Sequence, residues 1–216
     1  MRMYLSSFDL GACPERLVSL VGEGRRAAIV VNALDHRPEA RASWLESQSR
    51  KLAALGFHVT ELDLRQYFDA PQELNAELAK LDLVWVNGGN AFLLRRAMKQ
   101  SGFDVRIVEL LKRDAIVYAG FSAAVVITST NLRALDQVSN PREIADGYVP
   151  AVVWEGLGLL PYSIVVHFES DHPESAAVNA EVEFYERHGV PYRTLRDGEA
   201  LVIDGEGCGI AGGTDG

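Results

Sequence analysis

The sequence predicts an α/β fold in which a mostly parallel sheet carries helices on both faces. Over the first 130 residues, short apolar runs alternate with amphipathic stretches. The runs at 26–33 and 115–120 are nearly continuous in apolar residues, as strands covered on both faces should be. Strands and helices alternating in this order are typical of parallel strands joined by helical crossovers. In such sheets ligands bind where the strands end.

The elements of the first half are separated by glycines and by changes in periodicity. The predicted strands are residues 3–7, 26–33, 57–64, 81–89 and 115–120. The predicted helices are residues 39–56, 90–102 and 103–114. The helix at 39–56 has apolar residues at helical spacing and stops at a glycine. Two strand ends, at 86–90 and 119–123, are therefore the candidate ligand sites.

The second half is less regular. Residues 129–160 carry asparagine, proline and glycine between short apolar pieces, which predicts a long, partly irregular segment over one face. A buried strand at 162–168 and a helix at 173–189 follow. Closing strands or hairpins are expected at 192–195, 199–205 and 208–213. No linker interrupts the pattern, so we expect one domain, 1–216.

Composition argues against several classes of function. The chain of 216 residues has a net charge of −9, which repels phosphate backbones and argues against a nucleic-acid partner. No apolar run approaches the ~18 residues of a membrane span, and the N-terminus lacks the features of a signal peptide. We therefore expect no membrane partner and a cytoplasmic location. Cys13 and Cys208 form neither a disulfide framework nor a zinc cluster. The oligomeric state stays open, with a homodimer as one candidate.

Ser122 lies in the stretch YAGFSAAVVI, between a predicted strand and a predicted helix. A nucleophile elbow has the pattern G-x-S-x-G. Gly120 is present, but Ala124 occupies the second glycine position. The small neighbours leave the serine uncrowded, as an exposed nucleophile requires. A serine that caps a helix N-terminus is the alternative interpretation.

His167 and the VNGGN turn are the other candidates for chemistry. His167 ends a predicted strand, and a parallel strand would bring it to the same sheet edge as Ser122. A serine needs such a base to become a nucleophile. The turn at 86–90 lacks the lysine of a P-loop and the third glycine of a dinucleotide fingerprint. Its backbone N–H groups, with that of Ala123, suit an oxyanion hole, although a tight strand-to-helix turn explains them equally well.

Four segments occur in a fixed order over nearly the whole chain: WVNGGNAFLLRRAMKQSGFD, YAGFSAAVVI, IVVHF and LRDGEALVIDG. Together they resemble the peptidase E family, which includes aspartyl dipeptidases and cyanophycinases. The resemblance implies a class I glutamine-amidotransferase-like α/β fold. It also implies a serine peptidase that hydrolyses short peptides with no metal and no organic cofactor.

The resemblance implies roles for individual residues. Ser122 matches the nucleophile and His167 the general base. The residues that match the oxyanion-binding and substrate-binding turn are Gly88, Gly89 and Asn90, with the Ala123 N–H beside them. The triad acid falls before the penultimate strand, where Asp197 is the best match and Glu199 and Asp136 are alternatives. A turn residue in a D-G hairpin is a strong alternative interpretation of Asp197.

Two features depart from the family pattern. Ala124 replaces the last glycine of the elbow, which favours the alternative of a catalytically inactive member that binds a small molecule or a partner. Aspartyl dipeptidases carry an arginine shortly after the histidine, whereas this chain has Glu169 and Asp171. We therefore expect Asp-X dipeptides to be poorer substrates than peptides with a neutral or basic residue. The arginines that could reverse this preference are Arg95, Arg96, Arg133 and Arg142.

Overall fold

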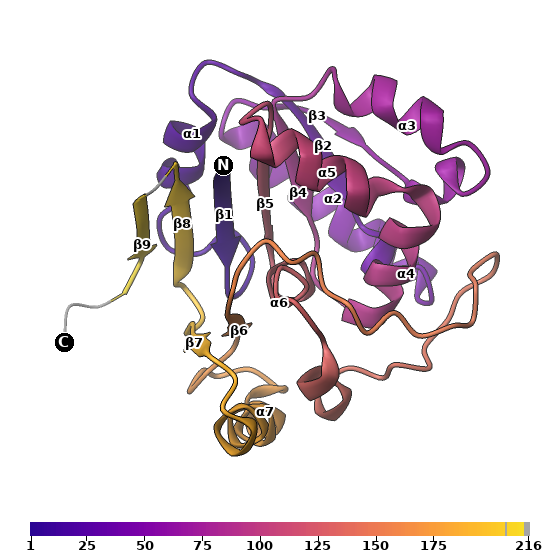
Figure 1. Ribbon diagram of the computed structural model, residues 1–216. Coiled ribbons are helices and arrows are strands. Elements are labelled where there is room, and N and C mark those ends of the chain that lie inside the picture. The colour runs from indigo at the N-terminus through magenta and orange to yellow at the C-terminus, as the bar shows by residue number, and fades with distance from the viewer. Residues whose placement is uncertain (206, 214–216) are drawn as a thin grey trace.

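A computed structural model describes residues 1–205 and 207–213 and contains a seven-stranded sheet (Figure 1). Its strands are β1 (Arg2–Ser6), β2 (Arg26–Val30), β3 (His58–Glu61), β4 (Leu83–Val86), β5 (Val117–Phe121), β8 (Ala200–Asp204) and β9 (Gly207–Ala211). The order across the sheet is β3-β2-β4-β5-β1-β8-β9. Strands β1 to β5 run parallel, and β8 and β9 add an antiparallel hairpin at one edge. The mostly parallel sheet predicted from the sequence is confirmed.

Helices cover both faces of this sheet. On one face lie α1 (Glu15–Val21) and α2 (Pro38–Ala54), and on the other α3 (Pro71–Leu78), α4 (Ala91–Ser101) and α5 (Phe103–Lys112). Strand β4 shows why the apolar runs are continuous. Val84 and Val86 pack into the core of one face, whereas Leu83 and Trp85 pack into the core of the other. Successive side chains of a strand point to opposite faces, so a sheet covered twice needs apolar residues at every position.

Two of these helices were not predicted from the sequence. Helices α1 and α3 have only seven and eight residues, about two turns each. So short a stretch gives little periodicity, and its stability comes from packing against the sheet rather than from helix propensity. Leu17 of α1 and Leu74 of α3 supply that packing, because both side chains are buried.

The C-terminal part forms a second, smaller layer beside the main sheet. Strand β6 (Ser163–Val165) pairs in parallel with β7 (Tyr192–Thr194), and α7 (Ser175–His188) packs against β6. In Figure 1 these elements lie beyond the edge at which the parallel strands end. The strand predicted at 162–168 is therefore shorter than expected and lies outside the main sheet. It nevertheless delivers His167 to the predicted edge.

The irregular segment between η3 (Arg133–Gln137) and β6 is held to the fold by two buried arginines of α4. The Arg95 guanidinium donates to the carbonyl of Glu155 and pairs with Asp104. The guanidinium of Arg96 donates to four backbone carbonyls, those of Pro141, Glu143, Pro150 and Ala151. These donors replace the hydrogen bonds that a strand or helix would supply, so both arginines serve the fold.

Within the described residues, no helix combines the length and the apolar character that crossing a membrane requires.

Candidate active site

Ser122 is the single residue between β5 and the short helix α6 (Ala123–Val126). Its backbone has φ 51° and ψ −111°, a conformation that costs a residue with a side chain about 1–3 kcal/mol. Its amide N–H donates to the carbonyls of Ser6 and Ser7 at the end of β1. Its side chain makes no capping hydrogen bond to α6. The conformation is that of a nucleophile elbow and differs from the helix cap that was the alternative interpretation.

Ala124 fits behind the elbow because Gly120 has no side chain. A Cβ placed on Gly120 would lie 2.7 Å from the Ala124 Cβ and 2.2 Å from the Val86 carbonyl oxygen. The Tyr118 hydroxyl donates to the Ala124 carbonyl at 2.8 Å and so fixes the start of α6. The methyl group of Ala124 therefore fills space that Gly120 leaves, and it does not flatten the turn at Ser122.

His167 follows β6 and meets Asp197 from the loop before β8. The two side chains lie 2.7 Å apart, measured from His167 Nδ1 to Asp197 Oδ1. The side chain of His167 is 1% exposed, and Nε2 is buried without a hydrogen-bond partner among residues 1–205 and 207–213. Burial lowers the pKa of His167 below 6.5; Asp197 opposes this shift, and His172 adds to it. At neutral pH the imidazole is neutral, with Nε2 available to accept a proton.

Ser7, at the end of β1, connects His167 to Asp197 and was missed from the sequence. Its hydroxyl donates to Asp197 Oδ1 at 2.8 Å and accepts the backbone N–H of His167 at 2.8 Å. The Asp197 amide N–H in turn donates to Ser170 Oγ at 2.8 Å. The available signal was the position of Ser7, a polar residue where β1 ends beside β5.

The two alternative acids lie elsewhere. The Glu199 carboxylate accepts the backbone N–H of Arg196 at 2.7 Å and so closes the turn that carries Asp197. Asp136 is exposed on η3, where its carboxylate accepts from Gln137. In the part of the chain that the structure describes, Asp197 alone among the three contacts His167.

The Gly88–Gly89 turn needs both of its glycines. A Cβ on Gly88 would lie 2.8 Å from the Phe121 ring and 3.0 Å from the Ser122 Cβ, so the turn packs directly against the elbow. Gly89 has φ 135°, and a Cβ there would lie 2.8 Å from the Ala33 carbonyl oxygen. The N–H groups of Gly88, Gly89 and Ala123 meet no acceptor within the described ranges.

Asn90 is used differently from the two glycines. Its N–H donates to the Ala33 carbonyl at 3.0 Å, and its side-chain oxygen caps α4 by accepting the Leu93 N–H at 2.9 Å. Its side-chain amide donates to the Asn140 carbonyl at 2.9 Å. In the unliganded protein these groups of Asn90 serve the fold, and its role in substrate binding stays a prediction.

A cavity of about 300 Å³ opens over Ser122, His167 and the glycine turn. Phe8, Trp44 and Phe121 form its aromatic wall. Its charged and titratable lining residues are Arg37, His167, His172 and Glu174. Arg37 was not among the arginines considered from the sequence, and in the described residues its guanidinium has no ion-pair partner.

The lining corrects the expected source of negative charge near His167. Glu169 is exposed and pairs with Arg196, and Asp171 is exposed; neither lines the cavity. Glu174 supplies the carboxylate instead. Of the four arginines considered from the sequence, Arg95 and Arg96 are buried in the fold, Arg133 lies over the Trp154 ring, and Arg142 is exposed outside the lining.

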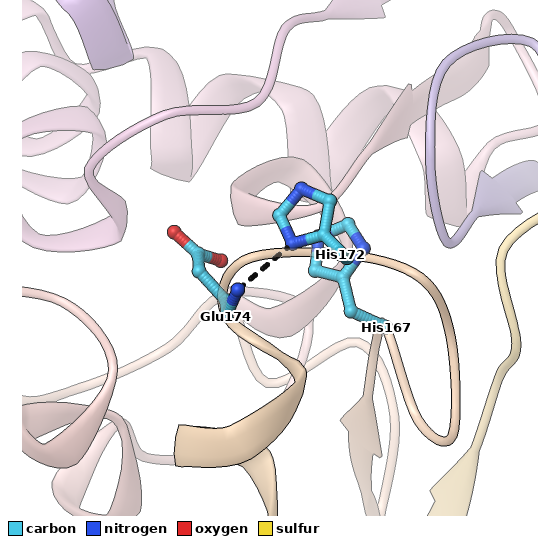
Figure 2. A group of neighbouring side chains, drawn as sticks. All are labelled: His167, His172 and Glu174. Atoms are coloured by element: carbon cyan, nitrogen blue, oxygen red, sulfur yellow. Dashed lines mark hydrogen bonds between the residues drawn. The ribbon is translucent and has the colours of Figure 1, made fainter.

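His167, His172 and Glu174 have ligand atoms within 4.8 Å of one another and are the candidate for a bound cation (Figure 2). The two imidazoles are stacked, with centroids 3.7 Å apart and planes within 6°. Stacked rings direct their in-plane lone pairs side by side, whereas zinc needs nitrogen lone pairs that converge at about 2.0–2.1 Å. His172 Nδ1 also accepts the Glu174 N–H at 3.2 Å. This geometry suits ring stacking better than metal ligation.

Comparison with known proteins places this chain in a family. The model of Peptidase family S51 matches residues 15–211. Peptidase E of Streptomyces coelicolor is 28% identical over 159 residues, covering 71% of this chain and 61% of that protein. An uncharacterized peptidase of Listeria monocytogenes is 29% identical over 127 residues, covering 59% and 58%. A Drosophila melanogaster protein named "Probable alpha-aspartyl dipeptidase" is 28% identical over 134 residues, covering 60% and 52%. The chain spans about three fifths or less of the length of these relatives.

A crystal structure of a protein named "Putative Peptidase E Protein" from Listeria monocytogenes superposes with a TM-score of 0.79 at 24% identity, covering 99% of this chain and 98% of that one. A peptidase from an acI-B1 Actinobacterium superposes with a TM-score of 0.62 at 18% identity, covering 98% and 87%. These likenesses confirm the predicted glutamine-amidotransferase-like α/β fold. Because the family model covers most of the sequence, the chain belongs to peptidase family S51.

Proposed function

We propose that this protein is a serine-type peptidase that hydrolyses short peptides, with Ser122, His167 and Asp197 as its catalytic triad. The observation that carries the proposal is the buried, unpartnered Nε2 of His167. It lines the same cavity as the strained Ser122, while Nδ1 of the same ring is held by Asp197. A base oriented on one nitrogen and open on the other is what an activated serine requires.

In the proposed reaction, Ser122 Oγ attacks the carbonyl carbon of the peptide bond, and its proton passes to His167 Nε2. Asp197 accepts the Nδ1–H, which fixes the tautomer and stabilises the imidazolium. The N–H groups of Gly88, Gly89 and Ala123 donate to the oxyanion. His167 then gives the proton to the leaving amine. Water hydrolyses the resulting acyl-enzyme, again with His167 as the base.

No hydrogen bond joins the Ser122 hydroxyl to His167 in the described residues of the free protein. Catalytic hydrogen bonds in unliganded enzymes are often long and tighten when substrate binds. The ring of His172 stacks against one face of the His167 ring.

The competing candidate is an inactive family member that binds a ligand in the same cavity. Ala124 is the feature that suggested it, and its close fit against Gly120 removes that support.

Labelling with a fluorophosphonate separates the two candidates. The wild-type protein should be modified at Ser122, as located by peptide mass mapping, and Ser122→Ala should be unlabelled while keeping its circular dichroism spectrum. Hydrolysis by Ser122→Ala should fall by roughly 10⁶-fold, as for loss of a triad serine in other hydrolases. A wild-type protein that is neither labelled nor active on any short peptide would favour the binding protein.

A further inference from the structure

Asn87 lies between the end of β4 and the Gly88–Gly89 turn. Its backbone N–H still belongs to the sheet, because it donates to the Val30 carbonyl at 2.9 Å. The residue is 1% exposed and is among those that line the main cavity. Side chains of a strand alternate between the two faces, so Asn87 continues the apolar row of Leu83 and Trp85. An amide at this position calls for a role that an apolar residue would not provide.

The side-chain amide of Asn87 is only half satisfied. Nδ2 donates to the Gly88 carbonyl at 2.9 Å. Oδ1 is buried without a hydrogen-bond partner among residues 1–205 and 207–213. An unpaired buried acceptor costs stability, so a leucine of similar shape would serve the core at least as well. What the amide adds over such a residue is its hold on the Gly88 carbonyl oxygen.

The peptide group between Gly88 and Gly89 needs such a hold. Glycine restricts chain rotation less than any other residue, so two in succession leave the plane of their shared peptide group poorly determined. This peptide is trans, and the carbonyl oxygen and N–H of a trans peptide point in opposite directions within one plane. A hydrogen bond that fixes the Gly88 oxygen therefore also fixes the direction of the Gly89 N–H.

The Gly89 N–H is the donor that this arrangement leaves available. Gly89 is exposed and lines the main cavity together with Ser122 and His167. Its N–H meets no acceptor within the described ranges, whereas the carbonyl on the other side of the same peptide is held by Asn87. The peptide is thus anchored on its buried side and free to donate on the other.

We propose that Asn87 is a positioning residue of the oxyanion hole, which holds the Gly88–Gly89 peptide so that the Gly89 N–H is directed at the oxyanion. The inference rests on the proposed peptidase function, and Asn87 acts through the turn without touching the substrate. Donors held in place in advance stabilise the charge that develops in the transition state more than they stabilise the neutral carbonyl. Asn87 should therefore affect turnover and leave substrate binding unchanged.

Asn87→Leu keeps the approximate shape of the side chain and removes its donor. With Ala-Leu as the substrate, we expect kcat to fall about 100-fold and KM to change less than about twofold, since losing one oxyanion donor lowers kcat by about 10²–10³. Asn75→Leu is the control, because Asn75 is exposed on α3 and should keep wild-type kinetics. A folded Asn87→Leu protein with wild-type kcat would overturn the inference.

A transition-state analogue separates positioning from a purely structural role. The boronate analogue of alanine, 1-aminoethylboronic acid, forms a tetrahedral adduct with a serine and places an oxygen where the oxyanion forms. Its Ki should rise about 100-fold in Asn87→Leu, in step with the fall in kcat/KM, while the thermal unfolding midpoint stays close to that of the wild type. A variant that loses stability but keeps its boronate affinity would show that Asn87 serves only the fold, which contradicts the proposal.

Two further results would bear on the role of Asn87. If Asn87→Leu does not fold, Asn87→Ala removes the same donor without filling its space and should give the same changes in kcat and Ki. A higher KM with unchanged kcat in either variant would show that Asn87 contacts the substrate directly, and the positioning role would be wrong.

The rate of fluorophosphonate labelling distinguishes failure of this inference from failure of the proposed function. The phosphoryl oxygen of the probe takes the oxyanion position, so labelling of Ser122 should be at least about tenfold slower in Asn87→Leu than in the wild type, whichever peptide is the substrate. Equal labelling rates would overturn the role of Asn87 while the serine peptidase stands. A wild-type protein that is neither labelled nor active on short peptides would overturn both.

Discussion

The two halves of the candidate site are positioned by different means. Ser122 and the Gly88–Gly89 turn lie at the ends of neighbouring strands, β5 and β4, and their geometry follows from backbone hydrogen bonding and from the absence of side chains. His167 and Asp197 lie outside the main sheet, shortly after the ends of the parallel strands β6 and β7. They are held by side-chain hydrogen bonds, and Ser7 connects them from about 160 and 190 residues away.

This difference indicates where the site is vulnerable. The nucleophile half is part of the buried core, so a larger residue at Gly88, Gly89 or Gly120 would disturb folding as well as activity. The base and acid depend on a few side-chain hydrogen bonds outside the main sheet, and single substitutions there can separate activity from stability. Substitutions that affect His167 or Asp197 should therefore change turnover while changing the free energy of unfolding only modestly.

Asp197→Asn tests the strongest of these contacts. The amide cannot stabilise the imidazolium and favours the wrong tautomer of His167, so kcat should fall by roughly 10⁴-fold. Glu199→Gln and Asp136→Asn should each lose less than about tenfold, because neither carboxylate touches the histidine. Steady-state kinetics on a short peptide, with thermal unfolding as the folding control, measures all three. A loss for Glu199→Gln as large as that for Asp197→Asn would show that the wrong acid has been assigned.

Ser7→Ala removes the hydroxyl that connects His167 to Asp197. The backbone N–H of His167 would lose its acceptor, which costs about 1–3 kcal/mol of stability. The imidazole ring would then no longer be held in its position relative to Ser122. Misplacement of this kind lowers kcat by about 10–100-fold with little change in KM. Ser6→Ala is the matched control, since the Ser6 hydroxyl donates to the Phe8 carbonyl and not to the triad. Partial recovery in Ser7→Thr would identify the hydroxyl as the cause; an active, stable Ser7→Ala would leave it without a positioning role.

Substrate charge tests the cavity that both halves enclose. Glu174 and Glu181 disfavour an acidic side chain near His167, so we expect kcat/KM for Asp-Leu to be about tenfold below that for Ala-Leu, with Lys-Leu at least equal to Ala-Leu. Arg37 is the residue able to reverse this order, because it lines the same cavity. A preference for Asp-Leu that disappears in Arg37→Ala would assign acidic recognition to Arg37 and contradict the expectation.

The smallest expected effect concerns pH. His167 must be neutral to accept the Ser122 proton, and burial holds its pKa below 6.5, so the acid limb of kcat/KM should lie below pH 6.5. Asp197 favours the charged ring, so Asp197→Asn should move the limb further to acid pH. An uncharged acyl p-nitroanilide is the suitable substrate, because it carries no titratable group of its own. An acid limb above pH 6.5 would show that His167 is more solvated or more strongly paired than the structure indicates.

Much of the structure of the first 130 residues, including the Ser122 turn, could be predicted from the sequence because the signals there are local. Continuous apolar runs predict strands buried on both faces, and the glycines at 88, 89 and 120 mark turns that no larger residue fits. Ser122 stands out because Gly120, Ala123 and Ala124 leave it uncrowded between a predicted strand and a predicted helix, although a helix cap was an alternative interpretation. The pairing of Ser122 with His167 was first suggested by their positions at predicted strand ends, and the resemblance to peptidase E then implied the roles of nucleophile and base.

The tertiary structure decided the rest. Long-range hydrogen bonds leave no trace in spacing, so the link from Ser7 to His167 and Asp197 was invisible, as was the entry of Arg37 into the cavity. Glu181 is the clearest case. In the sequence it is one of several glutamates in an ordinary amphipathic helix, and only the packing of α7 against β6 buries it beside Ser122. A carboxylate in water is solvated and needs no protein partner, whereas burying it without a partner costs free energy. That cost arises only once the chain has folded.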